Sequence, residues 1–175
     1  MAVEEREKER QKGHAGFRNK YSPLGEEIDE EHLDHVIEYD NGKAKIELTL
    51  DSGAANHVLP TEMFPKIKRK QHEAAKMGKC FYDAGGKPIP NEGEKTIQFL
   101  TLAGHKQRIT WQVAKVVRPL LSMGKLEEAN CKMEFEQGKR FIWVPATGEK
   151  IPVTKKNGTY KVNMWIDMDV VGPVF

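Results

Sequence analysis

The sequence predicts an all-β domain that closes into a small barrel, with one or two short helices, extra C-terminal hairpins and a polar N-terminal tail. Three observations lead to this class. Short runs rich in β-branched and aromatic residues follow one another along most of the chain, turns containing glycine separate them at intervals of about ten residues, and long helical patterns are missing. The 175 residues suffice for one domain with its own core.

The first 40 residues differ in charge from the rest of the chain. They hold six Lys or Arg residues against twelve Asp or Glu residues, whereas residues 41–175 hold 22 against 14. We therefore expect an acidic tail over residues 1–40, with a helical pattern over residues 26–36, followed by a mildly basic body. Within the body we expect a first domain over residues 41–130 and a C-terminal β extension over residues 131–175 that packs on it.

The body begins with the turn signal Asn41-Gly42 and a strand. Residues 43–50 alternate strictly between polar and apolar side chains, which is the pattern of a half-buried strand. Residues 58–60 predict a short second strand. Between the two lies Asp51, a carboxylate at the tip of a buried strand, where it is costly unless it is hydrogen-bonded or used. Asp51 is therefore the first candidate for chemistry.

The middle of the chain predicts a short helix and a hairpin. The helix falls within the basic residues 61–79, and a segment rich in glycine and proline follows over residues 82–93. Two β-rich runs then flank a turn at residues 103–106, which indicates a hairpin. The remaining elements are a short apolar strand that leads into a helix over residues 118–129, and strands over residues 132–135, 139–144 and 159–166.

The surroundings of Asp51 resemble the active-site loop of the retropepsins, the aspartic proteases of retroviruses and retrotransposons. The family pattern is two apolar residues, then Asp, Ser or Thr, Gly and Ala, with apolar residues returning a few positions later. This chain has Thr49-Leu50-Asp51-Ser52-Gly53-Ala54, then Val58-Leu59. The resemblance implies that Asp51 is the catalytic carboxylate and that Ser52, Gly53 and Ala54 hold the active-site loop.

Later segments follow the same family order. A glycine-rich flap hairpin is expected next, and Tyr82–Ile89 lies at the right distance; the resemblance implies that Ala84, Gly85, Gly86 and Ile89 contact substrate. An apolar strand behind the loop, running into a helix, corresponds to Pro119–Leu126, although Ser122 replaces the usual glycine. The match is closest to protease segments of copia-type retroelement polyproteins, through residues 112–116, 120–122, 132–135 and 158–162.

The resemblance implies an aspartic endopeptidase with a polypeptide substrate and no metal or other cofactor. Because the chain has one Asp-Ser-Gly, it supplies half of a catalytic dyad and requires a two-fold homodimer. The alternative is a domesticated, catalytically inactive subunit that binds other protein subunits in a larger complex. Pro88 and Pro90, which stiffen the expected flap, and the long C-terminal part favour this alternative.

Other constellations give weaker indications. His57, His72, His105 and Cys80 have no metal-ligand spacing, so we expect no metal site. The basic run over residues 66–70 lacks interleaved aromatic residues, so we do not expect nucleic acid as a partner. Two separated cysteines favour a reducing, intracellular compartment. The sequence shows neither a signal peptide nor a run of apolar residues that could span a membrane.

Overall fold

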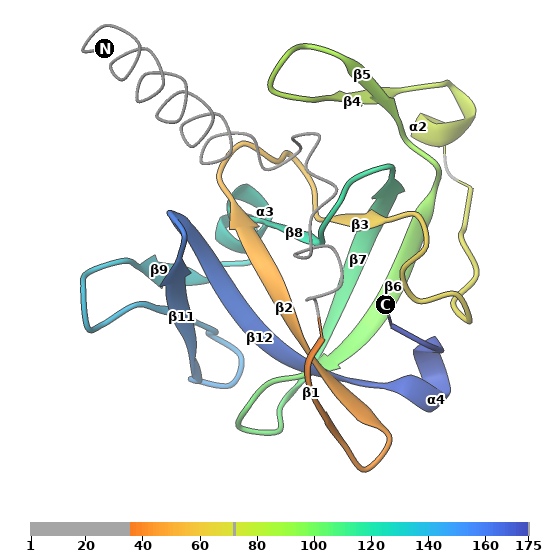
Figure 1. Ribbon diagram of the computed structural model, residues 1–175. Coiled ribbons are helices and arrows are strands. Elements are labelled where there is room, and N and C mark those ends of the chain that lie inside the picture. Colours follow the sequence, from red (N-terminus) through yellow and green to blue (C-terminus); the bar gives the residue numbers. More distant parts are fainter. Residues whose placement is uncertain (1–35, 72, 175) are drawn as a thin grey trace, which may run out of the picture.

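The computed structural model describes residues 36–71 and 73–174, which are mostly β-strand (Figure 1). Short helices occur at three places, α2 (Glu73–Lys76), α3 (Met123–Glu128) and α4 (Met168–Val171). The strands are β1 (Val36–Asp40), β2 (Lys43–Asp51), β3 (Val58–Pro60), β4 (Cys80–Tyr82), β5 (Pro88–Pro90), β6 (Glu94–Leu100), β7 (Lys106–Ala114), β8 (Leu120–Ser122), β9 (Lys132–Glu134), β10 (Phe141–Trp143), β11 (Lys150–Lys156) and β12 (Thr159–Asp167).

Six strands close into a barrel in the order β2, β8, β3, β7, β6 and β12, and β12 returns to β2. The β2–β8 and β3–β7 pairs are parallel, whereas the β6–β7 and β2–β12 pairs are antiparallel. Single bridges join β3 to β8 at Val58 and Leu120, and β6 to β12 at Leu100 and Trp165. The predicted all-β barrel is therefore confirmed.

The core lies inside this barrel because alternate residues of each strand point inward. In β2, Ala44, Ile46, Leu48 and Leu50 are all buried, as the alternation predicts. Phe99 of β6 and Trp111 of β7 are fully buried with ring centroids 5.9 Å apart. The strict alternation of residues 43–50 thus belongs to β2, one of the strands that close the barrel.

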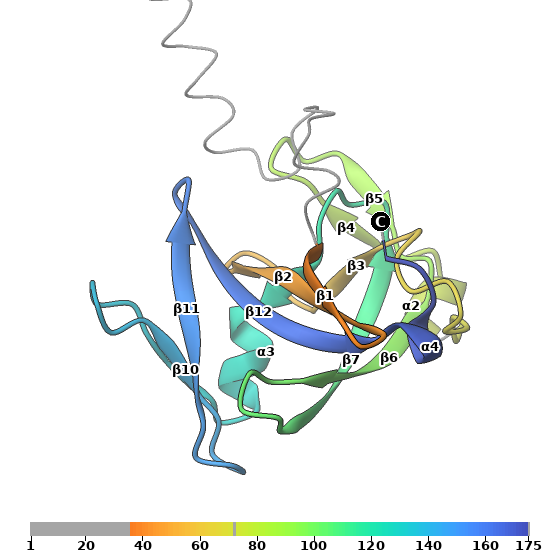
Figure 2. The ribbon, with the colours of Figure 1, turned by 60° about the horizontal axis from the view of Figure 1, so that its bottom comes forward.

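Two smaller units extend from the barrel. Strands β9, β10 and β11 continue the sheet beyond β12 and form a wing on the side of α3, seen in Figures 1 and 2. Strands β4 and β5 form a separate two-stranded hairpin, and its Phe81 and Ile89 pack on Val58, Ala114 and Leu120. Both units pack on the barrel through apolar side chains, so they have fixed places in the fold.

The sequence predictions missed several elements. Strands β1 and β11 and helix α4 had no predicted counterpart, whereas the predicted strands at 43–50 and 58–60 and the hairpin around 103–106 are present. The predicted helical pattern over residues 26–36 and most of the tail lie outside the described residues.

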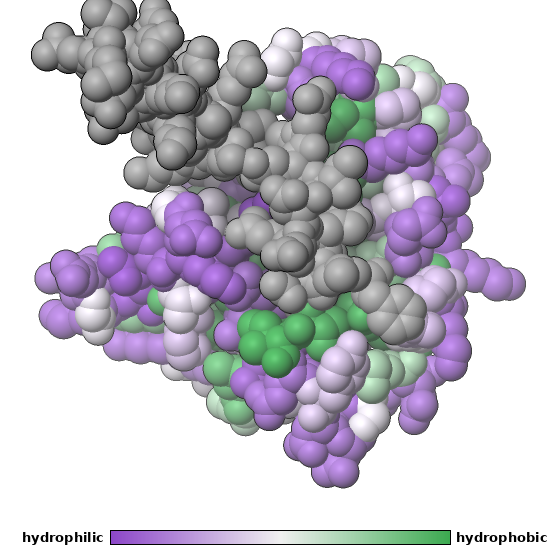
Figure 3. All heavy atoms as spheres, in the orientation of Figure 1, coloured by the Kyte–Doolittle hydropathy of each residue, from purple (hydrophilic) through white to green (hydrophobic). Residues whose placement is uncertain are grey.

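The outer surface is mainly polar. Figure 3 shows hydrophilic side chains over most of the visible face, with a small apolar area near β1. Exposed large apolar residues of the described part include Ile37 and Tyr39 of this strand. Among residues 36–71 and 73–174, none of the helices has the length and apolar character needed to cross a membrane.

Replacing Trp111 by alanine tests whether this ring supports the barrel. We expect Trp111→Ala to lower the free energy of unfolding by about 3–5 kcal/mol, because the side chain is fully buried and leaves a cavity. Trp143→Ala is the matched control: its ring lies on the wing and is half-buried, so the loss stays below about 2 kcal/mol. Urea unfolding measures both, and equal losses would contradict the assigned core.

Candidate functional site

Asp51 is the last residue of β2 and begins a loop, residues 51–57, that we call the Asp51 loop. Its Oδ1 accepts a hydrogen bond of 2.7 Å from the N–H of Gly53. A Cβ at Gly53 would lie 3.3 Å from the same oxygen, so a side chain there would crowd the carboxylate. No other partner of this carboxylate is found in the described part of the chain, which leaves Oδ2 available.

Hydrogen bonds and strand pairing connect the Asp51 loop to β8. Asp51 and Ser122 are paired in the parallel register of β2 and β8, and Thr49 N–H donates to Pro119 O at 3.1 Å. The Ser122 hydroxyl is fully buried and donates to Ala54 O at 2.6 Å. It also accepts from Lys125 N–H at 3.2 Å and so caps α3. One side chain therefore joins the loop, the strand and the helix.

His57 makes the second connection between the loop and β8. Its Nδ1 accepts the Ser122 N–H at 2.9 Å, which places the proton of the neutral ring on Nε2. The ring lies against Trp111, with centroids 5.4 Å apart. Burial, together with the positive charge of Lys125, lowers the pKa of His57 to about 4. The ring is thus neutral at physiological pH, as its role as an acceptor requires.

The segment predicted to form a flap is a hairpin with an ordered turn. Asp83 Oδ1 accepts from the N–H groups of Gly85 at 2.9 Å and Lys87 at 2.8 Å. Gly86 has φ +81°, a conformation that favours glycine. The turn residues Ala84, Gly85 and Gly86 are exposed, whereas Ile89 is half-buried.

The structure brings only some of the predicted site residues together. Asp51, Ser52, Gly53 and Ala54 share one loop, and Ile89 packs on Val58 and Leu120, which flank this loop in space. The hairpin and the Asp51 loop lie at the same end of the barrel in Figure 1. Within the described residues, no hydrogen bond joins the hairpin turn to the Asp51 loop, so these two parts are connected through the base of the hairpin.

Sequence reasoning missed the functions of Ser122 and His57. Ser122 was noted only as a replacement for glycine, and His57 only in the context of metal ligands. The signals for both were weak: a serine before a helix can cap it, and a histidine followed by Val58 and Leu59 is a candidate for burial. The other histidine that the structure describes, His105, contacts Glu149 through Nδ1 at 2.9 Å; His72 lies outside the described residues.

No family model matches this chain, and no curated protein matches it.

Ser122→Ala tests the connection between loop and strand. We expect a loss of about 2 kcal/mol in the free energy of unfolding, because Ala54 O and Lys125 N–H lose their partner. Ser52→Ala removes an exposed hydroxyl from the same loop and should change stability by less than about 0.5 kcal/mol. Thermal or urea unfolding compares them, and a neutral Ser122→Ala would refute the connection.

The lowered pKa of His57 predicts a pH dependence of stability. As the pH falls, the unfolded chain protonates His57 before the folded chain does. The free energy of unfolding is therefore highest above about pH 6.5 and decreases as the pH drops towards 4. Because the ring is partly exposed to solvent, we expect a decrease of about 2 kcal/mol. In His57→Asn, an amide oxygen accepts from Ser122 without titrating, so the variant loses less stability over this range. Equal pH dependence in both proteins, measured by urea unfolding, would exclude this effect.

Proposed function

We propose that this chain is a retropepsin-like aspartic endopeptidase, of the kind found in copia-type retroelement polyproteins, and that it works as a two-fold homodimer. The observation that carries the proposal is the Asp51 carboxylate. It stands at the tip of a barrel strand, with Oδ1 held by Gly53 N–H at 2.7 Å and Oδ2 without a partner in the described residues.

The order of the surrounding elements supports this proposal. A hairpin follows the Asp51 loop, and β8 then pairs with β2 directly behind the loop and runs into α3. These are the elements that the resemblance of the sequence leads us to expect. The exposed Ser52 and Gly53 leave the front of the loop accessible in the described structure, which is where a second loop would have to approach.

The proposed chemistry needs two copies of Asp51 face to face. Two carboxylates at such close range share one proton, because like charges there cannot both ionise. One carboxylate then acts as the base on a water molecule, and the protonated one polarises the scissile carbonyl of a peptide. The hairpin turn at residues 84–86 closes over the substrate and excludes water.

A mixing experiment tests both the carboxylate and the dimer. Wild-type chain is unfolded and refolded with increasing fractions of Asp51→Asn at a constant total chain concentration, and cleavage of a proteome-derived peptide library is measured by mass spectrometry at mildly acidic pH. Because each active site needs Asp51 from both chains, activity falls with the square of the wild-type fraction, to about a quarter at equal mixing. A linear fall would contradict the shared dyad.

The matched control is Asp167→Asn. Asp167 also accepts a hydrogen bond from the N–H two residues ahead, at 2.9 Å, and it caps α4 outside the Asp51 loop. Asparagine caps helices about as well as aspartate, so this variant should fold and cleave as the wild type does, alone or in mixtures. An equal loss of activity in both variants would point to a general effect of removing a carboxylate.

A second candidate is a non-catalytic subunit that binds other proteins. The specific observation in its favour is the position of Pro88 and Pro90 in β5, where they flank Ile89 and restrict the hairpin. This candidate predicts that wild-type and Asp51→Asn chains are equally folded and that neither cleaves any library peptide.

A further inference from the structure

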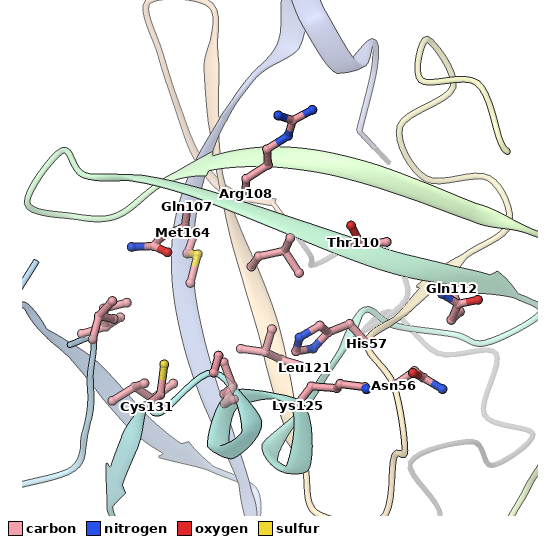
Figure 4. A pocket seen from close by; sticks show the side chains of 16 residues that line it. Asn56, His57, Gln107, Arg108, Thr110, Gln112, Leu121, Lys125, Cys131 and Met164 are labelled. Carbon is pink, nitrogen blue, oxygen red and sulfur yellow. The ribbon is translucent and has the colours of Figure 1, made fainter. Parts of the chain in front are cut away.

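A groove of about 420 Å³ lies between β7 on one side and α3 with the wing strands on the other (Figure 4). This is within the range of volumes typical of ligand sites. Its apolar lining residues include Leu121, Leu126, Ile142, Ile151 and Met164. Asp51 and the hairpin turn do not line the groove, although Asn56 and His57 of the Asp51 loop do. The groove is therefore distinct from the Asp51 carboxylate but shares part of its loop.

One wall of the groove is an unpaired strand edge. On the side away from β6, β3 covers only residues 112–114 of β7. Gln112 N–H points to this side, since it donates to His57 O at 2.8 Å. The backbone N–H and C=O groups of successive residues in a strand point to opposite sides, so those of Thr110 and Arg108 point to the same side as those of Gln112, away from β6. Both residues line the groove. In the described structure, β3 stops at residue 112 of β7, and the backbone groups of Arg108 and Thr110 on this edge have no backbone partner.

Two of the polar side chains that line the groove, His57 and Lys125, supply a specific donor and a positive charge. His57 projects into the groove, and its Nε2–H is a donor because Nδ1 is occupied by Ser122 N–H (Figure 4). Lys125 supplies a positive charge; its ion pair with Glu128 is exposed and contributes little. None of the lining residues is acidic. The Arg108 side chain points away from the groove (Figure 4), so this residue contributes its backbone.

We propose that this groove binds an extended, acidic peptide segment of another protein, which adds as a strand to the free edge of β7. Alternate backbone groups of the peptide pair with Arg108 and Thr110, and its apolar side chains fill the groove. An acidic side chain of the peptide meets Lys125, and a peptide oxygen accepts from His57. The extended backbone matches the strand edge, and the charge of the peptide complements that of the groove.

The probe is a short fluorescent synthetic peptide that alternates valine and threonine and ends in glutamate. Binding is followed by anisotropy, and the amide signals of Arg108 and Thr110 are followed by NMR. N-methylation of alternate nitrogens on the edge that faces β7 should weaken binding at least about tenfold, whereas N-methylation on the opposite edge should not. Equal effects of the two modifications, or no binding at millimolar peptide, would overturn the proposal.

A charge exchange tests the contact with Lys125. Lys125→Glu should weaken binding of the glutamate-ending peptide about fivefold and strengthen binding of a lysine-ending peptide by a similar factor. Lys139→Glu, at another exposed lysine, is the control and should change neither value. An equal effect of the two variants would overturn the assigned contact between the peptide and Lys125. The proposal would also be overturned if the amide signals of Arg108 and Thr110 moved with protein concentration alone, since a second copy of this chain would then occupy the groove.

This inference does not depend on the proposed endopeptidase activity. The Asp51→Asn variant should bind the peptide as the wild type does, because Asp51 is not part of the groove. Failure of the peptide experiment therefore does not affect the protease proposal, and failure of the mixing experiment does not affect the proposal that the groove binds a peptide. Loss of peptide binding in Asp51→Asn would overturn the separation of the two sites.

Discussion

The position of the Asp51 carboxylate depends on the buried hydroxyl of Ser122. This single group holds the Asp51 loop through Ala54 O and begins α3 through Lys125 N–H. The N–H of the same residue fixes His57, whose ring supports the loop from the inside against Trp111. Buried polar groups are costly when unpaired, so these contacts support one another and restrict the conformation of the loop. The same set orients the His57 donor into the groove behind the loop.

The sequence predicted the barrel well where one face of a strand is buried. Residues 43–50 alternate, and the predicted inward positions are the buried ones. The hairpin around residues 103–106 and the strand that leads into α3 were likewise predicted from local patterns. Asp51 became a candidate because a carboxylate at the end of such a strand violates the pattern. These features are local, and so they can be deduced from neighbouring residues.

Features that depend on distant residues were not predicted. The pairing of β12 with β2, which closes the barrel, joins residues more than a hundred positions apart. Lys95 shares the inward face of β6 with Ile97 and Phe99, but its hydrogen-bond acceptors, Met63 O at 2.9 Å and Phe64 O at 3.0 Å, lie more than thirty positions away. The bond between Ser122 and His57 spans 65 positions. A single sequence holds no local signal for partners that only the closed barrel brings together.

The proposed homodimer requires that two Asp51 loops meet across a two-fold axis, and a disulfide between two chains tests this contact. Ser52 is exposed beside Asp51, and the free cysteines Cys80 and Cys131 can be replaced by serine. A disulfide forms only where Cα atoms lie within about 7 Å. If the loops meet in this way, Ser52→Cys in this background oxidises to a covalent dimer that reducing agent separates. A folded protein that stays uncrosslinked under oxidising conditions would contradict the meeting of the loops.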